Sequence, residues 1–404
     1  MPLIHGKRTH ASVDTVRRRF VAVFRLLPAS CAEPQDGQYN GAATPMKGLL
    51  TMLSLVVLAV PAAAAPSTGM PSALQRMAFR RAAFRMPGSF HWPGHMWIWN
   101  GRLDPATLRA QLQDMAAHGA LSPMPLPEPP EFRPTNMPTR MEPPYLSPRF
   151  FEMIRVAAEE SKRLGLRLWL YDEGGWPSGN ACGQLVRNHP EFGRQSLSRS
   201  ETRLSTGQEA AAPADCVAAF VVENDGRRRR LQPCERMHVE EPGVRLLVFS
   251  VSRSSWHADL LNPRAVDAFI EMTHERYRQA IGGLFGTAVP AIFTDEPNMG
   301  AMPWTEGFAE AFRRDKGYDL VERLPSLYEG ESAEDEQTRI DYFDWWSERF
   351  AEAYFGRCRE WCKGAGIVFS GHLNGEDETL GARKNGFGDA MRMMRRMDIP
   401  GVDA

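Results

Sequence analysis

The chain has 404 residues with 48 basic and 49 acidic side chains, so its formal net charge at pH 7 is −1. A nearly neutral chain lacks the positive field that binding a polyanion requires, which argues against a nucleic-acid partner. Hydrophobic residues make up 43% and charged residues 24% of the sequence, which excludes a disordered or fibrous protein. The length suits two or three domains, or one α/β barrel of about 250 residues with additions.

The N-terminal part of the sequence has the pattern of an export signal. Met46 and Lys47 precede an apolar run from Leu49 to Val60, and small residues suited to cleavage continue to Ala65. The run is shorter than the roughly 20 residues that a membrane span needs. We therefore predict a mis-assigned leader at 1–45, a signal peptide at 46–65 and a mature chain at 66–404. The mature protein is expected to be periplasmic or secreted, with no membrane contact after signal removal.

Strand and helix signals alternate through the first half of the mature chain. His95–Gly101 reads as a strand, and the Asp104–Pro105 pair predicts the start of a helix that ends near His118. A short strand is expected near residue 120. The proline-rich stretch after it, up to 148, is predicted to be a long ordered loop, because proline suits neither a helix interior nor a central strand. A helix from Ser147–Pro148 to Leu164 follows, and a buried strand starts near residue 167.

The second half continues the alternation after a polar, strand-rich interruption. We predict a small inserted β subdomain at about 185–258, a helix opening at Asn262–Pro263 and a strand at Val289–Pro297. A helical region over about 304–364 leads to a strand near 367. A short helix at about 388–397 precedes a last strand start near 398. Apolar strands that alternate with helices predict a parallel sheet with helices outside.

Polar side chains gather just after the predicted strands. Parallel strands of an α/β barrel place their carboxyl ends on one rim, where active sites lie, and no GxGxxG or Walker motif suggests a nucleotide-binding sheet instead. The predicted fold class is therefore α/β, as a TIM-type barrel. About six strands are present where a closed barrel has eight, so we expect the missing strands to lie beyond Ala404.

The sharpest motif is Phe293–Pro297, which places Glu296 at a strand end immediately before a proline. A carboxylic acid there could protonate the leaving oxygen of a glycoside while a second carboxylate across the cleft attacks or activates water. The neighbouring Asp295 adds negative charge that would help Glu296 to keep its proton. The alternative is that both acids only cap a helix.

Two further clusters supply candidate substrate contacts. In the segment Tyr171–Gly179, Asp172 and Glu173 could bind sugar hydroxyls or a metal and Trp176 could stack on a sugar ring; equally, this could be a glycine-rich loop with no ligand. In the segment Gly371–Asp377, His372 and Glu376 are candidates for hydroxyl contacts, and a structural histidine is the alternative. The first strand contributes two more candidates, Trp99 and Asn100. Any one tryptophan is more often a core residue than a sugar platform.

The ordered motifs WIWNGRL, RLGLRLWLYDEGGWPSG, DLLNPRAVDAFIEMTHERY, IFTDEP, GHLNGED and MDIPGVD resemble glycoside hydrolase family 106, the α-L-rhamnosidases and their relatives. The resemblance covers about residues 90–404. It implies a catalytic barrel with an inserted β subdomain and cleavage with inversion by two glutamates. Glu296 matches the acid, and its partner is expected after Ala404. The resemblance also implies that a calcium ion can lie near the site, with ligands that the sequence does not identify; no other cofactor is required.

The function predicted from the sequence is an exported glycoside hydrolase. Its substrate would be a polysaccharide from plants or microbes that ends in a deoxyhexose such as α-L-rhamnose. The alternative, from a different class, is a truncated and non-catalytic carbohydrate-binding remnant of such an enzyme.

Overall fold

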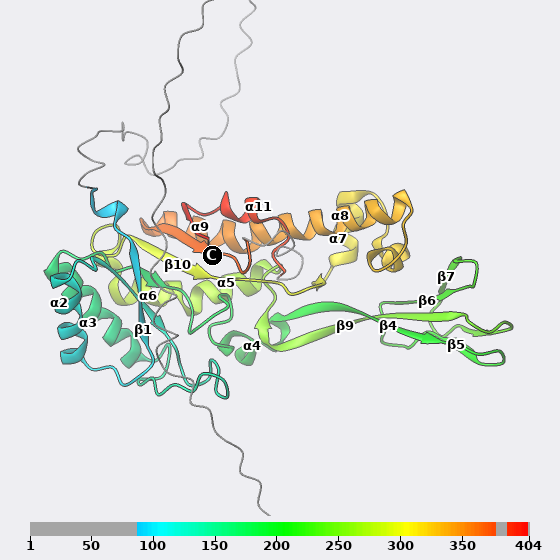
Figure 1. Ribbon diagram of the computed structural model, residues 1–404, viewed down its shortest axis with the longest axis horizontal. Helices are drawn as coiled ribbons and strands as arrows, with labels where there is room; N and C mark the ends of the chain where they lie inside the picture. Colours follow the sequence, from blue (N-terminus) through cyan, green and yellow to red (C-terminus); the bar gives the residue numbers. More distant parts are fainter. Residues whose placement is uncertain (1–86, 377–385, 403–404) are drawn as a thin grey trace, which may run out of the picture. The chain divides into compact units, whose positions relative to one another are not determined.

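The computed structural model describes residues 87–376 and 386–402 (Figure 1). These residues all fall in one contact unit, Thr68–Ala404. The predicted leader at 1–45 and the predicted signal peptide at 46–65 lie outside the described residues, and both stay predictions.

Parallel strands form the centre of the described chain. In chain order they are β1 (Gly94–Trp99), β2 (Ser122–Pro127), β3 (Leu170–Tyr171), β10 (Ala291–Asp295), β12 (Val368–His372) and β13 (Ile399–Pro400). β1 pairs with β2, and β13, β12, β10 and β3 pair in that order. Backbone hydrogen bonds from Arg167 to Leu121 and from Trp169 to Pro123, both 2.9 Å, connect β2 to the start of β3. The strands therefore lie side by side in the order of the sequence.

This arrangement confirms the α/β class with parallel strands. Among the described residues β1 pairs only with β2 and β13 only with β12, so the described part of the chain shows no closure into a barrel.

β2 corrects one expectation about proline. The strand carries Pro123, Pro125 and Pro127, yet it lies between β1 and β3. The three prolines occupy alternate positions of the strand, and the backbone carbonyls at these positions point towards β3. Pro123 accepts a hydrogen bond from the amide of Trp169, and Pro127 accepts one from the amide of Gly175 at 2.7 Å. The missing proline amides therefore interrupt only the β3 side. The residues between the prolines keep their backbone pairing with β1.

Two capped helices cover β1. Asp104 accepts from the amides of Ala106 and Thr107 at the start of α2 (Pro105–Ala117). Ser147 caps α3 (Pro148–Leu164), which ends at Gly165 in the left-handed conformation. Both helices begin and end within a few residues of the sequence prediction, because side-chain caps and a C-terminal glycine are local signals. Further along the chain, α5 (Pro263–Met272) begins at its Asn262 cap, and α6 (His274–Ile281) follows directly.

Residues 193–258 form an antiparallel sheet that is separate from the parallel strands. Its strands are β4 (Gly193–Arg203), β6 (Ala218–Val222), β7 (Arg228–Leu231) and β9 (Arg245–Ala258), and β11 (Pro303–Trp304) joins at the β4 edge. The short strands β5 (Glu209–Ala211) and β8 (Arg236–His238) form a second pair, and α4 (Gln184–Asn188) precedes β4. Figure 1 shows β4 and β9 running together as a long ribbon away from the parallel strands.

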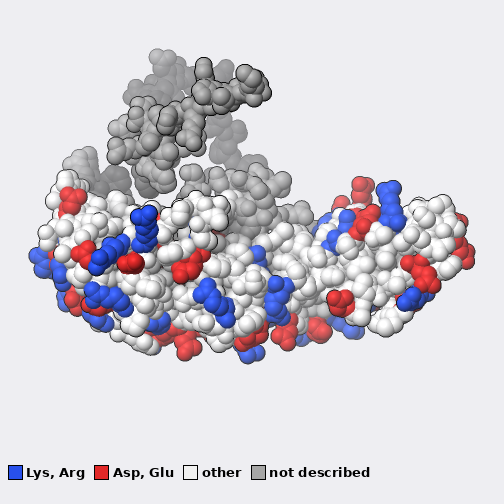
Figure 2. Space-filling view, turned by 90° about the horizontal axis from the view of Figure 1, so that it is seen from below, with Lys and Arg blue, Asp and Glu red and all other residues white. Residues whose placement is uncertain are grey.

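The C-terminal helices run from α7 (Phe308–Lys316) and η6 (Leu320–Leu327) to α8 (Ala333–Phe350), and α11 (Ala390–Met394) precedes β13. A π-helical segment, η7 (Ala351–Gly356), connects α8 to α9 (Arg357–Ala365). None of the described helices has both the length and the apolar character that crossing a membrane requires. Figure 2 shows basic and acidic side chains interspersed over one face, in keeping with the net charge near zero.

Candidate active site

Asp295 and His372 are the last residues of the neighbouring parallel strands β10 and β12, and they are paired in register. His372 Nε2 lies 2.5 Å from Asp295 Oδ1, and the hydroxyl of Tyr171, at the end of β3, donates to the other oxygen, Oδ2. Asp295 and His372 are each only 6% exposed. Three strand ends therefore meet at one buried carboxylate, as expected where parallel strands share a rim.

His372 is held as an imidazolium ion. Its second ring nitrogen, Nδ1, lies 2.8 Å from the carbonyl of Leu373 and 3.4 Å from Glu376 Oε1. Burial alone would lower the pKa of His372, but the bonds to Asp295 and Glu376 outweigh it and raise the pKa to about 10. Asp295 and His372 thus form an ion pair without net charge. The effect of the Asp295 charge on Glu296, suggested by the sequence, stays a prediction, and in the structure this carboxylate is paired with His372.

Glu296 follows β10 directly and is half-buried, beside this ion pair. Its φ of +51° lies in the left-handed region, which costs a non-glycine residue of order 1–3 kcal/mol and occurs preferentially at functional sites. Asn374 Nδ2 donates to Glu296 Oε2 at 2.8 Å. Carboxylate oxygens of Asp295 and Glu296 and a ring nitrogen of His372 all lie within 4.8 Å of one another. The strained turn thus aims the Glu296 carboxyl at the rim, where it is accessible.

Asp172 lies fully buried behind this rim. Ser178 Oγ donates to Asp172 Oδ1 at 2.6 Å and accepts from the amide of Asp295 at 2.8 Å, while the Ser178 amide donates to the Asp295 carbonyl at 2.7 Å. Tyr354, from the π-helical segment, donates to Asp172 Oδ2 at 3.4 Å and lies 2.8 Å from the Thr294 hydroxyl. Burial raises the pKa of Asp172 well above its usual value. These contacts hold the end of β10 in place from the buried side of the rim.

Glu173 organises the loop that follows β3. Its two oxygens accept four backbone amides, from Gly174, Asn180 and Ala181 at 2.8 Å and from Cys182 at 2.5 Å. Burial raises the pKa of Glu173 to about 7, although the four amides favour the ionised form. These contacts are those of a loop-organising carboxylate, the alternative that the sequence left open. A sugar contact of Glu173 stays a prediction.

The aromatic candidates lie in different surroundings. Trp99 is 1% exposed and packs in the core against Trp97 and Phe150, with ring centroids at 5.2 and 6.1 Å. Trp176 is half-buried, with Phe132 at 4.6 Å and the Arg133 guanidinium over its ring at 4.5 Å. Trp99 is therefore a core residue, and Trp176 already contacts a guanidinium and an aromatic ring of the protein.

Asn100 is exposed at the end of β1, and its carbonyl accepts from Arg140 at 2.9 Å. Its side chain bonds Glu128, the residue after β2, which is 3% exposed and whose pKa burial raises. Sequence reasoning missed Glu128, Ser178 and Tyr354. Glu128 and Ser178 could have been found as polar residues following strands β2 and β3. No local signal marks Tyr354, because it reaches the site from a helix.

The cluster of Asp295, Glu296 and His372 does not fit a calcium ion. Calcium takes six to eight oxygen ligands, whereas here both Asp295 oxygens are engaged and both His372 ring nitrogens lie in hydrogen bonds. The calcium ion implied by the family resemblance stays a prediction, and its ligands are not identified.

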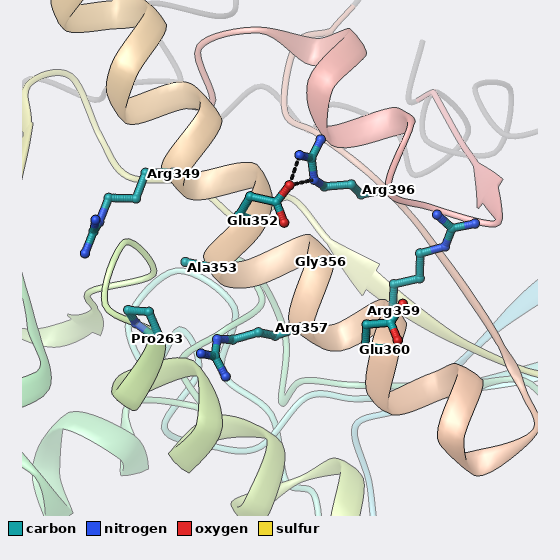
Figure 3. A pocket seen from close by; sticks show the side chains of 9 residues that line it. All are labelled: Pro263, Arg349, Glu352, Ala353, Gly356, Arg357, Arg359, Glu360 and Arg396. Carbon is teal, nitrogen blue, oxygen red and sulfur yellow. Dashed lines mark hydrogen bonds and ion pairs between the residues drawn. The ribbon is translucent and has the colours of Figure 1, made fainter. Parts of the chain in front are cut away.

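A surface pocket of about 690 Å³ lies on the outer helices, away from the strand ends (Figure 3). Its cationic side chains are engaged: Arg357 with Asp267 at 2.7 Å, Arg359 with Asp398 at 2.8 Å, and Arg396 with Glu348 and Glu352. Arg349 donates to the carbonyl of Leu261 at 3.2 Å. These charged side chains of the pocket are therefore already paired within the described part of the chain. The lining residues are Pro263, Arg349, Glu352, Ala353, Gly356, Arg357, Arg359, Glu360 and Arg396.

Comparison with known proteins finds a similarity to a glycosidase family. Residues 250–403 match the glycoside hydrolase family 106 model, described as alpha-L-rhamnosidase. The match contains β10, Glu296, β12 and His372. The resemblance inferred from the sequence motifs is therefore confirmed. It is a resemblance to glycosidases, and it lends no support to the alternative of a non-catalytic remnant.

Two individual proteins are similar to this chain over part of their length. A curated protein of Formosa agariphila named "Putative beta-glucuronidase" is 23% identical, in an alignment that covers 56% of this chain and 25% of that protein. The rhamnosidase structure from Novosphingobium sp. PP1Y superposes with a TM-score of 0.53 at 15% identity, covering 78% of this chain and 48% of that one. The second similarity establishes a shared fold. The chain spans a quarter of the curated relative and about half of the solved rhamnosidase.

Proposed function

We propose that this chain is the catalytic part of an exported glycoside hydrolase, built as a (β/α)8 barrel, that removes terminal deoxyhexose such as α-L-rhamnose from polysaccharides. The family match over 250–403 supports the glycosidase class. The observation that carries the mechanism is the position of Glu296, a half-buried carboxyl in a strained turn at the end of β10, beside a neutral ion pair.

In this mechanism Glu296 is the general acid. Glycosidic cleavage needs a carboxylic acid that protonates the leaving oxygen and a carboxylate that attacks or activates water. Asn374 orients the Glu296 carboxyl through the bond to Oε2. The Asp295 carboxylate is bound by Tyr171 and His372. Its role in this mechanism is to hold the strand ends together, so that polar side chains at the rim are positioned to contact substrate hydroxyls. His372 and Glu376 lie beside it at the same rim.

The experiment compares Glu296→Gln with the unchanged sequence, both in a complete version of the enzyme, on two rhamnosides. General acid assistance contributes about 10²–10⁴-fold, so turnover of a rhamnose-terminated oligosaccharide should fall by that factor. Turnover of 4-nitrophenyl α-L-rhamnoside should fall much less, because nitrophenolate leaves without a proton. Glu306→Gln, at an exposed glutamate in the turn before α7, is the control and should leave both rates unchanged.

Equal losses on both substrates would show that Glu296 is not the acid. Unchanged rates would place the chemistry elsewhere, and the absence of hydrolysis by the complete enzyme would contradict the activity. A parallel assay with 4-nitrophenyl β-D-glucuronide tests the activity that the name of the Formosa relative suggests.

Export is part of the same proposal. Mass spectrometry of protein expressed in a bacterial host with its periplasmic fraction isolated should find a mature N-terminus close to Pro66. A cytoplasmic protein that retains Met1 would contradict export.

A further inference from the structure

Arg194 stands out among the arginines of the antiparallel sheet. Arg199, Arg228 and Arg245 all pair with carboxylates of the C-terminal helical region, at 2.7–3.0 Å. Arg194, the second residue of β4, is half-buried, and within the described part of the chain it pairs with no carboxylate. One of its N–H groups donates to a described residue: Nη1 binds Asn298 Oδ1 at 3.1 Å. Since a guanidinium has five donors, the described residues take up only part of its hydrogen-bonding capacity.

Asp259 is the described carboxylate whose charge acts on Arg194, and both of its oxygens already accept hydrogen bonds. Asp259 raises the pKa of Arg194 through its charge, but burial of the guanidinium outweighs this and lowers that pKa. The two oxygens of Asp259 accept from the amide of Leu261 at 3.1 Å and from the hydroxyl of Thr305 at 2.5 Å. Asp259 is 1% exposed. Arg194 is thus a partly desolvated cation whose compensation is incomplete, an unfavourable state for an isolated protein.

Arg194 is linked to the candidate active site through one side chain. Asn298 accepts from Arg194 with Oδ1 and donates with Nδ2 to the backbone carbonyl of Glu296 at 3.1 Å. Gly300 closes the same turn with a φ of +73°, and a Cβ there would lie 3.4 Å from Arg194 Cζ. The guanidinium therefore lies against the turn that follows the proposed general acid.

His257 supplies a second group with unused hydrogen-bonding capacity. It lies near the end of β9, whose residue Ala258 pairs with Gly193 next to Arg194. His257 Nδ1 is buried and has no hydrogen-bond partner among the described residues. Burial and, second, the charge of Arg194 lower the pKa of His257 to about 4, so the imidazole is neutral at neutral pH and can donate one N–H. A charged donor on β4 and a neutral donor on the paired strand β9, each one residue from the Gly193–Ala258 pair, suit an anionic ligand.

We propose that Arg194 and His257 form an anion subsite next to the Glu296 turn, which binds an acidic substituent of the sugar chain, either a uronate carboxylate or a sulfate ester. The proposal rests on the proposed glycosidase function and specifies the charge of its substrate. Planar bidentate recognition of carboxylate and sulfate oxygens is the interaction for which a guanidinium is suited. A bound anion would complete the counter-charge that Asp259 supplies only in part.

Calorimetric titration of the full chain with two matched pairs of sugars and one inorganic ion tests the subsite. The pairs are methyl β-D-glucuronide with methyl β-D-glucoside, and L-rhamnose 3-sulfate with L-rhamnose; the ion is sulfate. The acidic member of at least one pair should bind about 10- to 100-fold more tightly than its neutral partner, the range expected for charge-assisted hydrogen bonds. The pair that shows the preference distinguishes carboxylate from sulfate ester.

Arg194→Met should abolish the preference and leave the affinity for the neutral sugar unchanged, and Arg194→Lys should reduce it. The control is Arg253→Met, on the paired strand, where the exposed guanidinium binds backbone carbonyls of Glu191 and Gly193. This control should keep the preference. Melting curves confirm that each variant folds, and if Arg194→Met unfolds, Arg194→Lys and His257→Phe carry the test.

Equal binding of acidic and neutral sugars by the unchanged chain would overturn the proposal, as would a preference that survives in Arg194→Met. Arg194-dependent binding of inorganic sulfate would support the subsite even if the Glu296→Gln experiment shows no role in hydrolysis. If hydrolysis of neutral rhamnosides depends on Glu296 but sugar binding shows no charge preference, only the anion-subsite proposal is contradicted. The proposed hydrolysis and the proposed anion subsite can therefore be contradicted independently of each other.

Discussion

His372 Nε2 lies 2.5 Å from Asp295 Oδ1, and this pair joins the carboxyl ends of β12 and β10 at the rim. Asp295 immediately precedes the proposed general acid, so the position of Glu296 depends on a buried ion pair. The Tyr171 hydroxyl on the other Asp295 oxygen extends the network to β3. The rim is thus organised by charge and hydrogen bonding rather than by the loops alone.

The first prediction concerns the pH dependence of stability. The folded pKa of His372, about 10, lies above the unfolded value of 6.5. Its contribution is therefore fully present below about pH 6.5 and is lost as the pH rises towards 10. Between these limits the folded state holds one more proton, so the free energy of unfolding should fall by about 1.4 kcal/mol per pH unit. Urea unfolding at pH 7, 8 and 9 should show this slope, and His372→Gln should lack it. Parallel curves for the two proteins would contradict the ion pair.

The second prediction concerns Glu173. Glu173→Gln keeps the shape of the side chain but turns an amide NH₂ towards backbone donors, so at least one of the four bonds is replaced by a donor–donor contact. We expect a loss of about 2–3 kcal/mol in the free energy of unfolding. Glu159→Gln, at an exposed position of α3, is the matched control and should change little. Denaturant melts measure both, and equal stabilities would show that the loop does not depend on this carboxylate.

The third prediction concerns the attachment of the antiparallel sheet. Asp335 accepts from Arg228 of β7 at 2.7 Å and from Ser326 and Ser332 at 2.6 Å. Burial opposes its ionisation, but these bonds prevail and hold its pKa well below the usual value. Asp335→Asn should cost about 3 kcal/mol at pH 7, as for a broken buried ion pair.

The sign of the pH effect at Asp335 is opposite to that at His372. A depressed carboxyl pKa stabilises the fold above the unfolded pKa, and this stability disappears as the pH falls through the folded pKa. The difference between Asp335→Asn and the unchanged chain should therefore shrink below about pH 4. The neighbouring exposed Glu334→Gln serves as control, and a pH-independent difference would argue against the ionic contact.

The fourth prediction separates a steric clash from backbone strain. Gly175 and Gly119 both have a φ of +80°, but a Cβ at Gly175 would lie 2.3 Å from the Phe132 ring, whereas nothing lies within 4 Å at Gly119. Alanine at either position strains the backbone by about 1 kcal/mol. Gly175→Ala should lose considerably more in thermal melts, because the loop that carries Ser178 must move. Similar melting temperatures for the two variants would show that Phe132 yields without cost.

The sequence by itself determined the features that depend on neighbouring residues. The helix from Ser147–Pro148 to Gly165 is set by its own caps, and the polar residues after β10 and β12 are identified by the end of each apolar strand. The order of strands and helices, and hence the meeting of Glu296 and His372 at one rim, follows from the same local signals. The motifs also sufficed to indicate the glycoside hydrolase family.

Tertiary structure decided which polar groups remain available. Glu173 and Asp295 look alike in sequence, yet Glu173 is satisfied by four amides and Asp295 by Tyr171 and His372. Tyr354 reaches Asp172 from a π-helical turn, and Arg194 reaches Asn298 across 104 positions of the chain. Capping and turn formation involve atoms a few residues apart, so the sequence encodes them locally. The partner of a buried charge is set by long-range packing, which only the folded chain defines.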